Sequence, residues 1–214
     1  MTKECPILFS APMVRAILNG RKTQTRRIVK LPKERGSWEP SSTGGVGVTY
    51  SDGTPCPEMS CIWNTSTGTS LICQHGLVGD RLWVRETFKQ YNGIISYKAD
   101  GNWISDFNDI DNFNPHENIK WKRSIHMPRS ASRILLEITG VRVERLQDIS
   151  ECDAKAEGSY VCDYFGRRLL DQSSNQGCYK WGYRSIWESL NGTGSWDLNP
   201  FVWVIEFKLL EVRK

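Results

Sequence analysis

The chain has 214 residues, of which 39% are hydrophobic and 24% are charged, and its formal net charge is +4. A chain of this length suits one domain, with or without insertions, and it can bury a core. No run approaches the roughly 20 apolar residues that a membrane helix requires, and the first residues lack the apolar stretch of a signal peptide. Seven cysteines, an odd number, indicate reduced thiols rather than a disulfide framework. We therefore expect a cytoplasmic protein without a membrane partner.

The N-terminal part contains two regular elements and then a loop-rich stretch. Residues 10–20 are predicted to form a short helix, because Ser10 can cap it and Gly20 is placed to end it. The Thr, Ile and Val side chains of residues 23–29 then favour a strand. Residues 31–78 are rich in Gly, Ser, Thr and Pro, and they are predicted to be an insertion that forms a loop or a weak hairpin.

The middle of the chain is predicted to be mostly β. Residues 79–88 combine a turn and a strand, and two β-like runs follow, next to Asn-Gly and Asp-Gly turn signals. Residues 100–124 are polar and rich in Asn and Asp, which indicates a second insertion. Residues 132–146 are a long β-rich run in which Gly140 favours a bend.

The C-terminal part is predicted to contain two helices and a closing strand. Residues 148–158 have a capping-box-like start and a glycine at the end, which favour a short helix. An irregular stretch, 159–181, forms a third insertion and precedes a helix at 183–192, whose expected buried side is Ile186, Trp187 and Leu190. Residues 201–212 form the last strand. This order predicts an α+β fold, a small β-barrel with flanking short helices, in a single domain over residues 1–214.

A basic cluster follows the first predicted helix. Residues 15–35 contain eight Lys or Arg but a single acid, Glu34. Such a cluster can attract phosphates, in which case binding would weaken with salt. The plainer alternative is a solvated face. A third alternative is chemistry, because a buried lysine near other cations loses its proton more readily and can accept one from a hydroxyl. Lys22 would then be the base for a Thr25 nucleophile.

The geometry of a strand bears on this pair. If the strand begins at Lys22, alternation places Lys22 and Thr25 on opposite faces. A turn over residues 20–23 would remove that objection, so both arrangements stay open.

Other catalytic and metal motifs find little support in the sequence. The three histidines lie near no Gly-x-Ser-x-Gly elbow, and the sequence has neither a P-loop nor a Gly-x-Gly-x-x-Gly fingerprint. Cys56, Cys61, Cys73 and His75 give C-x4-C-x11-C-x-H, which could in principle hold zinc. This spacing differs from the common zinc signatures, so we favour loop thiols without a ligand role and expect no cofactor.

Four segments in order along the chain resemble the ASCH domain, a relative of the PUA fold. They are ILNGRKTQTRR, GDRLWVRETF, DISECDAKAEG and VWVIEF. Longer stretches are similar to ASCH proteins of phages and prophages, with gaps at the loop-rich segments. The resemblance implies a small closed β-barrel with flanking helices around a cleft.

The resemblance also implies a site. Small bacterial ASCH proteins are amidohydrolases that remove the acetyl group from N4-acetylcytidine, and they use a lysine and a threonine of a GRKT-x-T segment with a later glutamate. Lys22, Thr25 and Glu157 occupy these positions. Thr25 would attack the acetyl carbonyl, Lys22 would activate it, and Glu157 would pass a proton to the leaving amine, as a carboxylic acid in an apolar cleft can.

Side chains near these motifs are candidates for substrate binding: Arg26, Arg27, Glu86, Arg129, Trp196 and Asn199. Arg27 matches a family arginine that could hold the substrate. Glu86 either lines the cleft or pairs structurally, and Arg129 either touches substrate or lies where the chain turns. The indole of Trp196 either stacks on a base or belongs to the core.

Two functions stay open at this stage. The first is an amidohydrolase that acts on an acylated cytidine-like base or nucleoside. The second is a module that binds nucleic acid, RNA rather than DNA, or a ribonuclease, because ASCH proteins do not share one activity. The chain is longer than the small amidohydrolases, and its added segments could cover or reshape the cleft.

Overall fold

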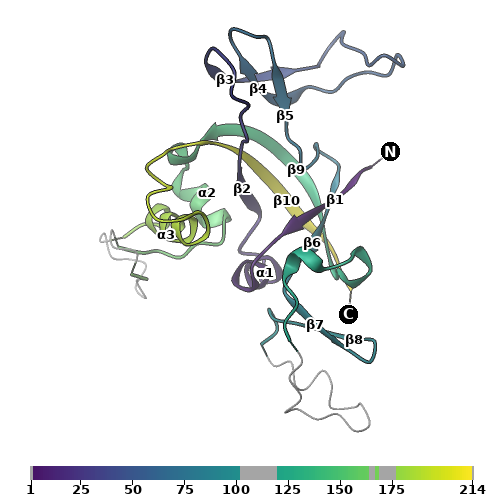
Figure 1. The fold of residues 1–214 in the computed structure, drawn as a ribbon, viewed down its shortest axis with the longest axis vertical. Helices are drawn as coiled ribbons and strands as arrows, with labels where there is room; N and C mark the ends of the chain where they lie inside the picture. Colours follow the sequence, from purple (N-terminus) through teal and green to yellow (C-terminus); the bar gives the residue numbers. More distant parts are fainter. Residues whose placement is uncertain (1, 102–119, 164–166, 169–176, 214) are drawn as a thin grey trace.

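The structure, a computed structural model, describes residues 2–101, 120–163, 167–168 and 177–213 (Figure 1). Over these residues the chain has an α+β fold dominated by strands. The central sheet has the strand order β1-β6-β9-β10-β2. Its strands are β1 (Glu4–Leu8), β2 (Gln24–Ile28), β6 (Arg81–Arg85), β9 (Ile134–Arg145) and β10 (Phe201–Val212).

The long strands β9 and β10 form the antiparallel centre of this sheet, and β1 pairs with β6 in parallel. The β9–β10 register shifts between Glu206 and Phe207, which lie opposite Gly140 and Ile138. A Cβ atom at Gly140 would come within 2.8 Å of Glu206 Oε2, the end of a flexible side chain that would have to move. The bend expected at Gly140 thus falls where the strand register shifts.

The central sheet is open, and the prediction of a closed barrel is wrong. Strands β1 and β2 are its two edges, and no strand pairing joins them among the described residues. One side chain spans the gap, because Arg27 Nη2 donates a hydrogen bond to the carbonyl oxygen of Leu8 at 2.6 Å. Closure of a barrel requires matched strand number, tilt and stagger, and these five strands leave their edges apart. A cavity lies at this gap.

The predicted loop or hairpin at 31–78 contains a small antiparallel sheet. Its strands are β3 (Trp38–Thr43), β4 (Met59–Asn64) and β5 (Ser70–Ile72). Ser60 Oγ donates to the carbonyl oxygen of Val141 at 2.9 Å, which ties β4 to the central sheet. In Figure 1 this small sheet lies at the end of the molecule away from α1.

A hairpin of β7 (Phe88–Tyr91) and β8 (Ile94–Tyr97) follows β6. Its turn has positive φ angles of 45° at Asn92 and 81° at Gly93, as the Asn-Gly signal predicts. Most of the insertion expected at 100–124 and about half of that expected at 159–181 lie outside the described residues.

The three predicted helices are confirmed. They are α1 (Ala11–Leu18), α2 (Glu151–Ala156) and α3 (Tyr179–Asn191), and short 3-10 turns occupy Ser124–His126, Arg129–Ala131 and Leu146–Asp148. Ser150 caps α2, where its side chain accepts a hydrogen bond from Asp153 N. Ser10 precedes α1 without a side-chain capping bond.

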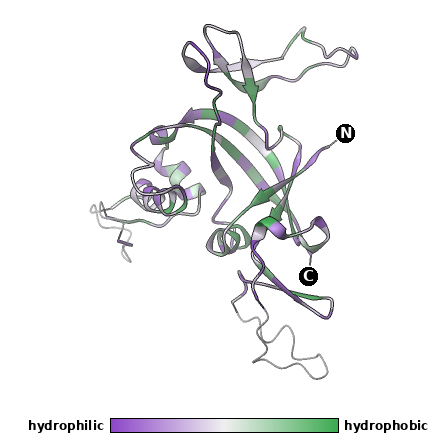
Figure 2. Cartoon of the chain, viewed as in Figure 1, coloured by the Kyte–Doolittle hydropathy of each residue, from purple (hydrophilic) through white to green (hydrophobic). Residues whose placement is uncertain are grey.

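The buried side of α3 differs from the prediction. Tyr183 and Trp187 are buried, whereas Leu190 is 56% exposed. Tyr183 and Trp187 pack with Trp196 against β10 in a second core. The main core lies between α1 and the central sheet. Figure 2 shows hydrophobic residues on the central strands and on α1. None of the described helices is long and apolar enough to cross a membrane.

Candidate active site

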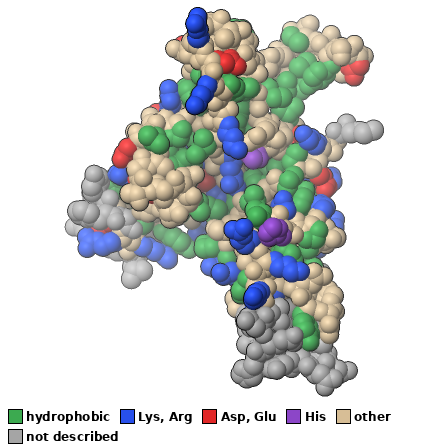
Figure 3. Space-filling model, viewed as in Figure 1, with side chains coloured by type: hydrophobic (Ala, Val, Ile, Leu, Met, Phe, Trp, Pro, Cys, Tyr) green, Lys and Arg blue, Asp and Glu red, His purple; other side chains and the backbone are tan. Residues whose placement is uncertain are grey.

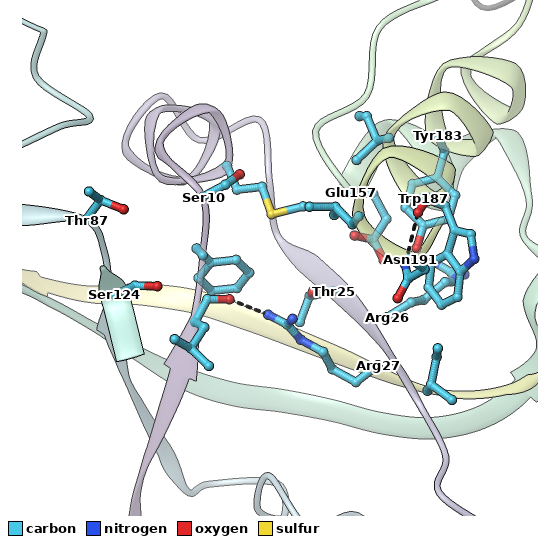
Figure 4. Close-up of a pocket in the computed structure, with 16 residues that line it drawn as sticks. Ser10, Thr25, Arg26, Arg27, Thr87, Ser124, Glu157, Tyr183, Trp187 and Asn191 are labelled. Atoms are coloured by element: carbon cyan, nitrogen blue, oxygen red, sulfur yellow. Dashed lines mark hydrogen bonds and ion pairs between the residues drawn. The ribbon is translucent and has the colours of Figure 1, made fainter. Parts of the chain in front are cut away.

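A cavity of about 410 Å³ lies at the gap between the edge strands β1 and β2. Its walls come from the end of β1, the start of α1, strand β2, the end of α2 and one side of α3. Thr25, Arg27 and Glu157 line it together (Figure 4). Its volume is in the range of cavities that hold small ligands.

The turn between α1 and β2 directs Lys22 into the protein. Gly20 has a φ of 67°, and the amides of Arg21 and Lys22 both donate to the carbonyl oxygen of Ala16. Thr23 N then donates to the carbonyl oxygen of Ala156 at the end of α2. Strand β2 begins only at Gln24, so strand alternation does not apply to Lys22, which forms a β-bridge with Glu157.

Lys22 and Glu157 form a buried ion pair. Lys22 Nζ lies 2.6 Å from Glu157 Oε2 and also donates to the Glu157 carbonyl oxygen at 2.9 Å. The two side chains are 0% and 3% exposed. Burial lowers the pKa of Lys22, and the neighbouring charges of Arg27 and Arg26 lower it further, while the Glu157 carboxylate opposes the shift. A lysine with a lowered pKa can act as a base.

The other oxygen of Glu157 meets Arg26. Arg26 Nη1 lies 3.2 Å from Glu157 Oε1, and Arg26 also pairs with Glu144 and with Asp153. Glu144 and Asp153 were not predicted as site residues, because nothing in the sequence pairs them with Arg26. Lys22 and Arg26 are therefore buried and neutralised, which excludes a solvated strand as the explanation of these two cations.

Thr25 is 3% exposed and lines the cavity. In Figure 4 its hydroxyl faces the space between Arg27 and Glu157. Across the part of the chain that the structure describes, both hydrogen bonds of Lys22 Nζ end on Glu157, so the expected direct bond to Thr25 is not formed. The reason is physical, since a desolvated ammonium gains more from a carboxylate than from a neutral hydroxyl.

Arg27 belongs to β2, and its guanidinium reaches across the gap toward β1, where it lies 5.3 Å from the centre of the Phe9 ring. Its buried Nε atom has no hydrogen-bond partner among the described residues. Burial lowers the pKa of Arg27. An unpaired donor at a cavity can bind a ligand oxygen. Figure 3 shows Lys and Arg side chains gathered over β2 on this face.

Aromatic and aliphatic side chains complete the cavity. Phe9, Tyr183 and Trp187 line it, together with Ile186 and Leu190 of α3. Burial raises the pKa of Tyr183 well above its ordinary value, so this phenol stays neutral. The sequence marked α3 as an amphipathic helix, but it carried no signal that this helix faces a ligand cavity.

Two of the predicted binding residues are structural ion-pair partners and do not line the cavity. Glu86 is buried and accepts hydrogen bonds from Arg133 Nε and Nη2 at 2.9 and 3.2 Å. Arg129 Nε lies 3.0 Å from Glu4 Oε2 near the surface. For both residues the structure favours the structural alternative.

Trp196 and Asn199 also lie away from the cavity lining. Trp196 is 6% exposed, and its ring meets the edge of Tyr183 at 6.3 Å in the second core. Asn199 has a φ of 42°, and its Oδ1 accepts a hydrogen bond from Gln147 N at 2.9 Å. Because Trp196 is enclosed by the core, its indole is not available to stack on a base.

The alternative zinc ligands are not assembled. No group of three or more His, Cys, Asp or Glu side chains in the described residues is arranged to hold a metal ion. Cys56, Cys61 and Cys73 are buried as free thiols, and burial raises the pKa of Cys73 to about 11. His75 is partly buried, and burial together with the charge of Arg27 lowers its pKa to about 4.

Comparison of the chain with protein-family models, with curated proteins and with solved structures found no match.

Proposed function

We propose that this protein is an ASCH-type amidohydrolase that removes an acyl group from a cytidine-like base or nucleoside of the N4-acetylcytidine type. One observation carries the proposal: Glu157, which lines the same cavity as Thr25, forms a buried ion pair with Lys22 at 2.6 Å. A lysine with a lowered pKa, a buried carboxyl group and a threonine hydroxyl are the groups that amide cleavage needs.

The first step uses Lys22 as a neutral base. The lowered pKa of Lys22 makes its neutral amine available. The side chain of Lys22 then turns to Thr25 and takes its hydroxyl proton as Thr25 Oγ1 attacks the acyl carbon. The carbonyl oxygen becomes an oxyanion, to which Arg27 Nε donates.

In the second step the tetrahedral intermediate collapses. The carbon–nitrogen bond breaks, Glu157 passes to the leaving amine the proton that Lys22 took from Thr25, and the acyl group stays on Thr25 as an ester. Water attacks this ester and releases a carboxylic acid, which restores the Thr25 hydroxyl. The walls formed by Phe9 and Trp187 suit a planar heterocycle in the cavity.

The nucleic-acid alternative would use the basic segment to grip phosphates. Lys22 and Arg26 cannot serve in this way, because both are buried and paired with carboxylates. The geometry of these two residues therefore favours the hydrolytic function.

The test is incubation of the folded protein with N4-acetylcytidine and chromatography for cytidine and acetate. Thr25→Ala and Lys22→Met should each lower kcat/KM about a thousandfold or more, with circular dichroism unchanged. Thr25→Ser should keep part of the activity, since it keeps a hydroxyl. Thr23→Ala is the matched control, because Thr23 is an exposed threonine of the same segment. If folded wild-type protein releases no cytidine, the proposal is wrong.

A further inference from the structure

A second cavity lies next to the cavity at Thr25. This second cavity has a volume of about 530 Å³ and lies between α1, α3 and the turn after α2. The two share Met13, Ile186 and Leu190, and Glu157 stands where they meet. The two cavities are therefore adjacent and share these lining residues.

The second cavity has a positive lining. Arg15 and Arg21 contribute to it, and its one acidic lining residue is Glu157, whose carboxylate is already paired with Lys22 and Arg26. The lining therefore carries uncompensated positive charge, which favours an anionic ligand.

A third cavity extends the positive surface. It has a volume of about 480 Å³, shares Arg21 and Tyr160 with the second, and adds Lys155 of α2. Among the described residues, Arg15, Arg21, Lys155 and Arg168 form no ion pair with a carboxylate. This contrasts with Lys22 and Arg26, whose charges are neutralised inside.

Tyr160 holds two of these cations in place. The guanidinium of Arg21 lies 4.7 Å from the centre of the Tyr160 ring, and that of Arg168 lies 3.5 Å from it. Arg21 Nη1 also donates to the carbonyl oxygen of Gly158 at 3.3 Å. Stacking orients a guanidinium without using up its donors, so these groups remain available to phosphate oxygens.

From the second and third cavities, and from the two guanidiniums stacked on their shared residue Tyr160, we infer a phosphate subsite at Arg21, Tyr160 and Arg168, next to the acyl site. The inference rests on the proposed function: the base occupies the first cavity, the sugar passes Glu157, and the phosphate reaches the second cavity. The substrate is then a phosphate ester of an acylated nucleoside rather than the free nucleoside. Such an ester is either a nucleotide or one unit of single-stranded RNA, and Lys155 in the third cavity favours the strand.

The first experiment compares three substrates: N4-acetylcytidine, its 5′-monophosphate, and a single-stranded RNA oligomer with one N4-acetylcytidine. We expect kcat/KM to be at least about tenfold higher for the phosphorylated substrates at low salt, and to fall as salt rises. A preference for the monophosphate alone identifies a nucleotide, and a further gain for the oligomer identifies RNA. Arg21→Ala and Lys155→Ala should each reduce the preference, and Lys155→Ala affects no contact of the acyl site.

The matched control is Arg81→Ala, which removes an exposed arginine at the start of β6 that pairs with Glu4 and lines none of the three cavities. It should leave the preference unchanged. Equal kcat/KM for all three substrates, with no effect of Arg21→Ala, would overturn the inference and leave the proposed function standing.

The second experiment measures binding without turnover. Fluorescence anisotropy with an unmodified single-stranded RNA oligomer and the Thr25→Ala protein should show affinity that falls with salt and with Arg21→Ala. If no substrate is deacylated but this binding is seen, the proposed function fails while the phosphate subsite survives. If the RNA does not bind, and the monophosphate is no better a substrate than the nucleoside, the subsite is excluded.

Discussion

Lys22 Nζ lies 2.6 Å from Glu157 Oε2, although the two residues are 135 positions apart in the chain. Lys22 comes from the turn after α1, and Glu157 is the residue that ends α2. Arg26 binds the second oxygen of the same carboxylate, so Glu157 compensates two buried cations at once. A buried ion pair of this kind depends on both partners, because removal of one leaves the other desolvated and unpaired.

Glu157→Gln should therefore destabilise the fold as well as remove activity. We expect the free energy of unfolding at pH 7 to fall by about 3 kcal/mol, because Lys22 loses its counter-charge inside the protein. Urea denaturation measures this change. The control is Glu137→Gln, since Glu137 pairs with Lys208 at the surface, where the side chains are 30% and 57% exposed, and should change the value by less than about 1 kcal/mol. Equal effects of the two substitutions would contradict a central role for Glu157.

The rate of acyl release should rise with pH. Burial holds the pKa of Lys22 below its ordinary value of 10.5, so the neutral amine becomes available within an accessible range. The positive charge of Arg27 contributes to this lowering. In Arg27→Met the rising limb of kcat/KM should move to higher pH, in addition to a lower plateau.

The pH–rate profile of Lys208→Met provides the comparison, because Lys208 is exposed and paired with Glu137. Its rising limb should coincide with that of the wild type. A limb that moves to lower pH in Arg27→Met would contradict the assignment of Lys22 as the base.

The pKa of His75 should depend on the charge of Arg27. Its pKa is lowered to about 4, first by burial and then by the charge of Arg27. NMR titration should find this value and a higher one in Arg27→Met. In the unfolded chain histidine takes up a proton near pH 6.5, so stability is complete above that pH and is lost as the pH falls toward 4.

The size of this loss follows from the partial exposure of His75. After allowance for solvent screening, we expect about 1 kcal/mol, which His75→Gln should not show. Urea denaturation of both proteins at pH 7 and at pH 4.5 measures the difference. An equal pH dependence of the two proteins would show that His75 titrates normally.

Glu86→Gln separates a structural role from substrate binding. Glu86 is buried against Arg133, whose guanidinium also pairs with Asp100 and lies 3.9 Å from the centre of the Tyr97 ring. We expect a loss of about 3 kcal/mol in the free energy of unfolding and no change in KM for N4-acetylcytidine. Glu4→Gln is the exposed counterpart and should cost less than about 1 kcal/mol. A higher KM with unchanged stability would instead place Glu86 in the binding site.

Much of the local structure could be predicted from the sequence, because its signals act over a few residues. Gly20 ends α1, Ser150 caps α2, and Asn92 begins the turn between β7 and β8. The long apolar runs of β9 and β10 likewise predict strands. Closure of a barrel depends on the number and stagger of strands that are distant in sequence. Local signals contain no information on these, so the prediction of a closed barrel was wrong.

The sequence by itself determined which residues carry charge and which segments form helices and strands. It marked Lys22, Thr25 and Glu157 through a resemblance, and it left open whether the basic segment is solvated, binds phosphate or does chemistry. Only the tertiary structure showed that Lys22 and Arg26 are buried and paired with carboxylates rather than solvated. The physical reason is that the state of a charge depends on its solvation, and solvation follows from distant segments that pack together. The packing of α2 against the turn after α1 buries Lys22 on Glu157, while Arg21, one residue earlier, stacks on Tyr160 and has no carboxylate partner among the described residues.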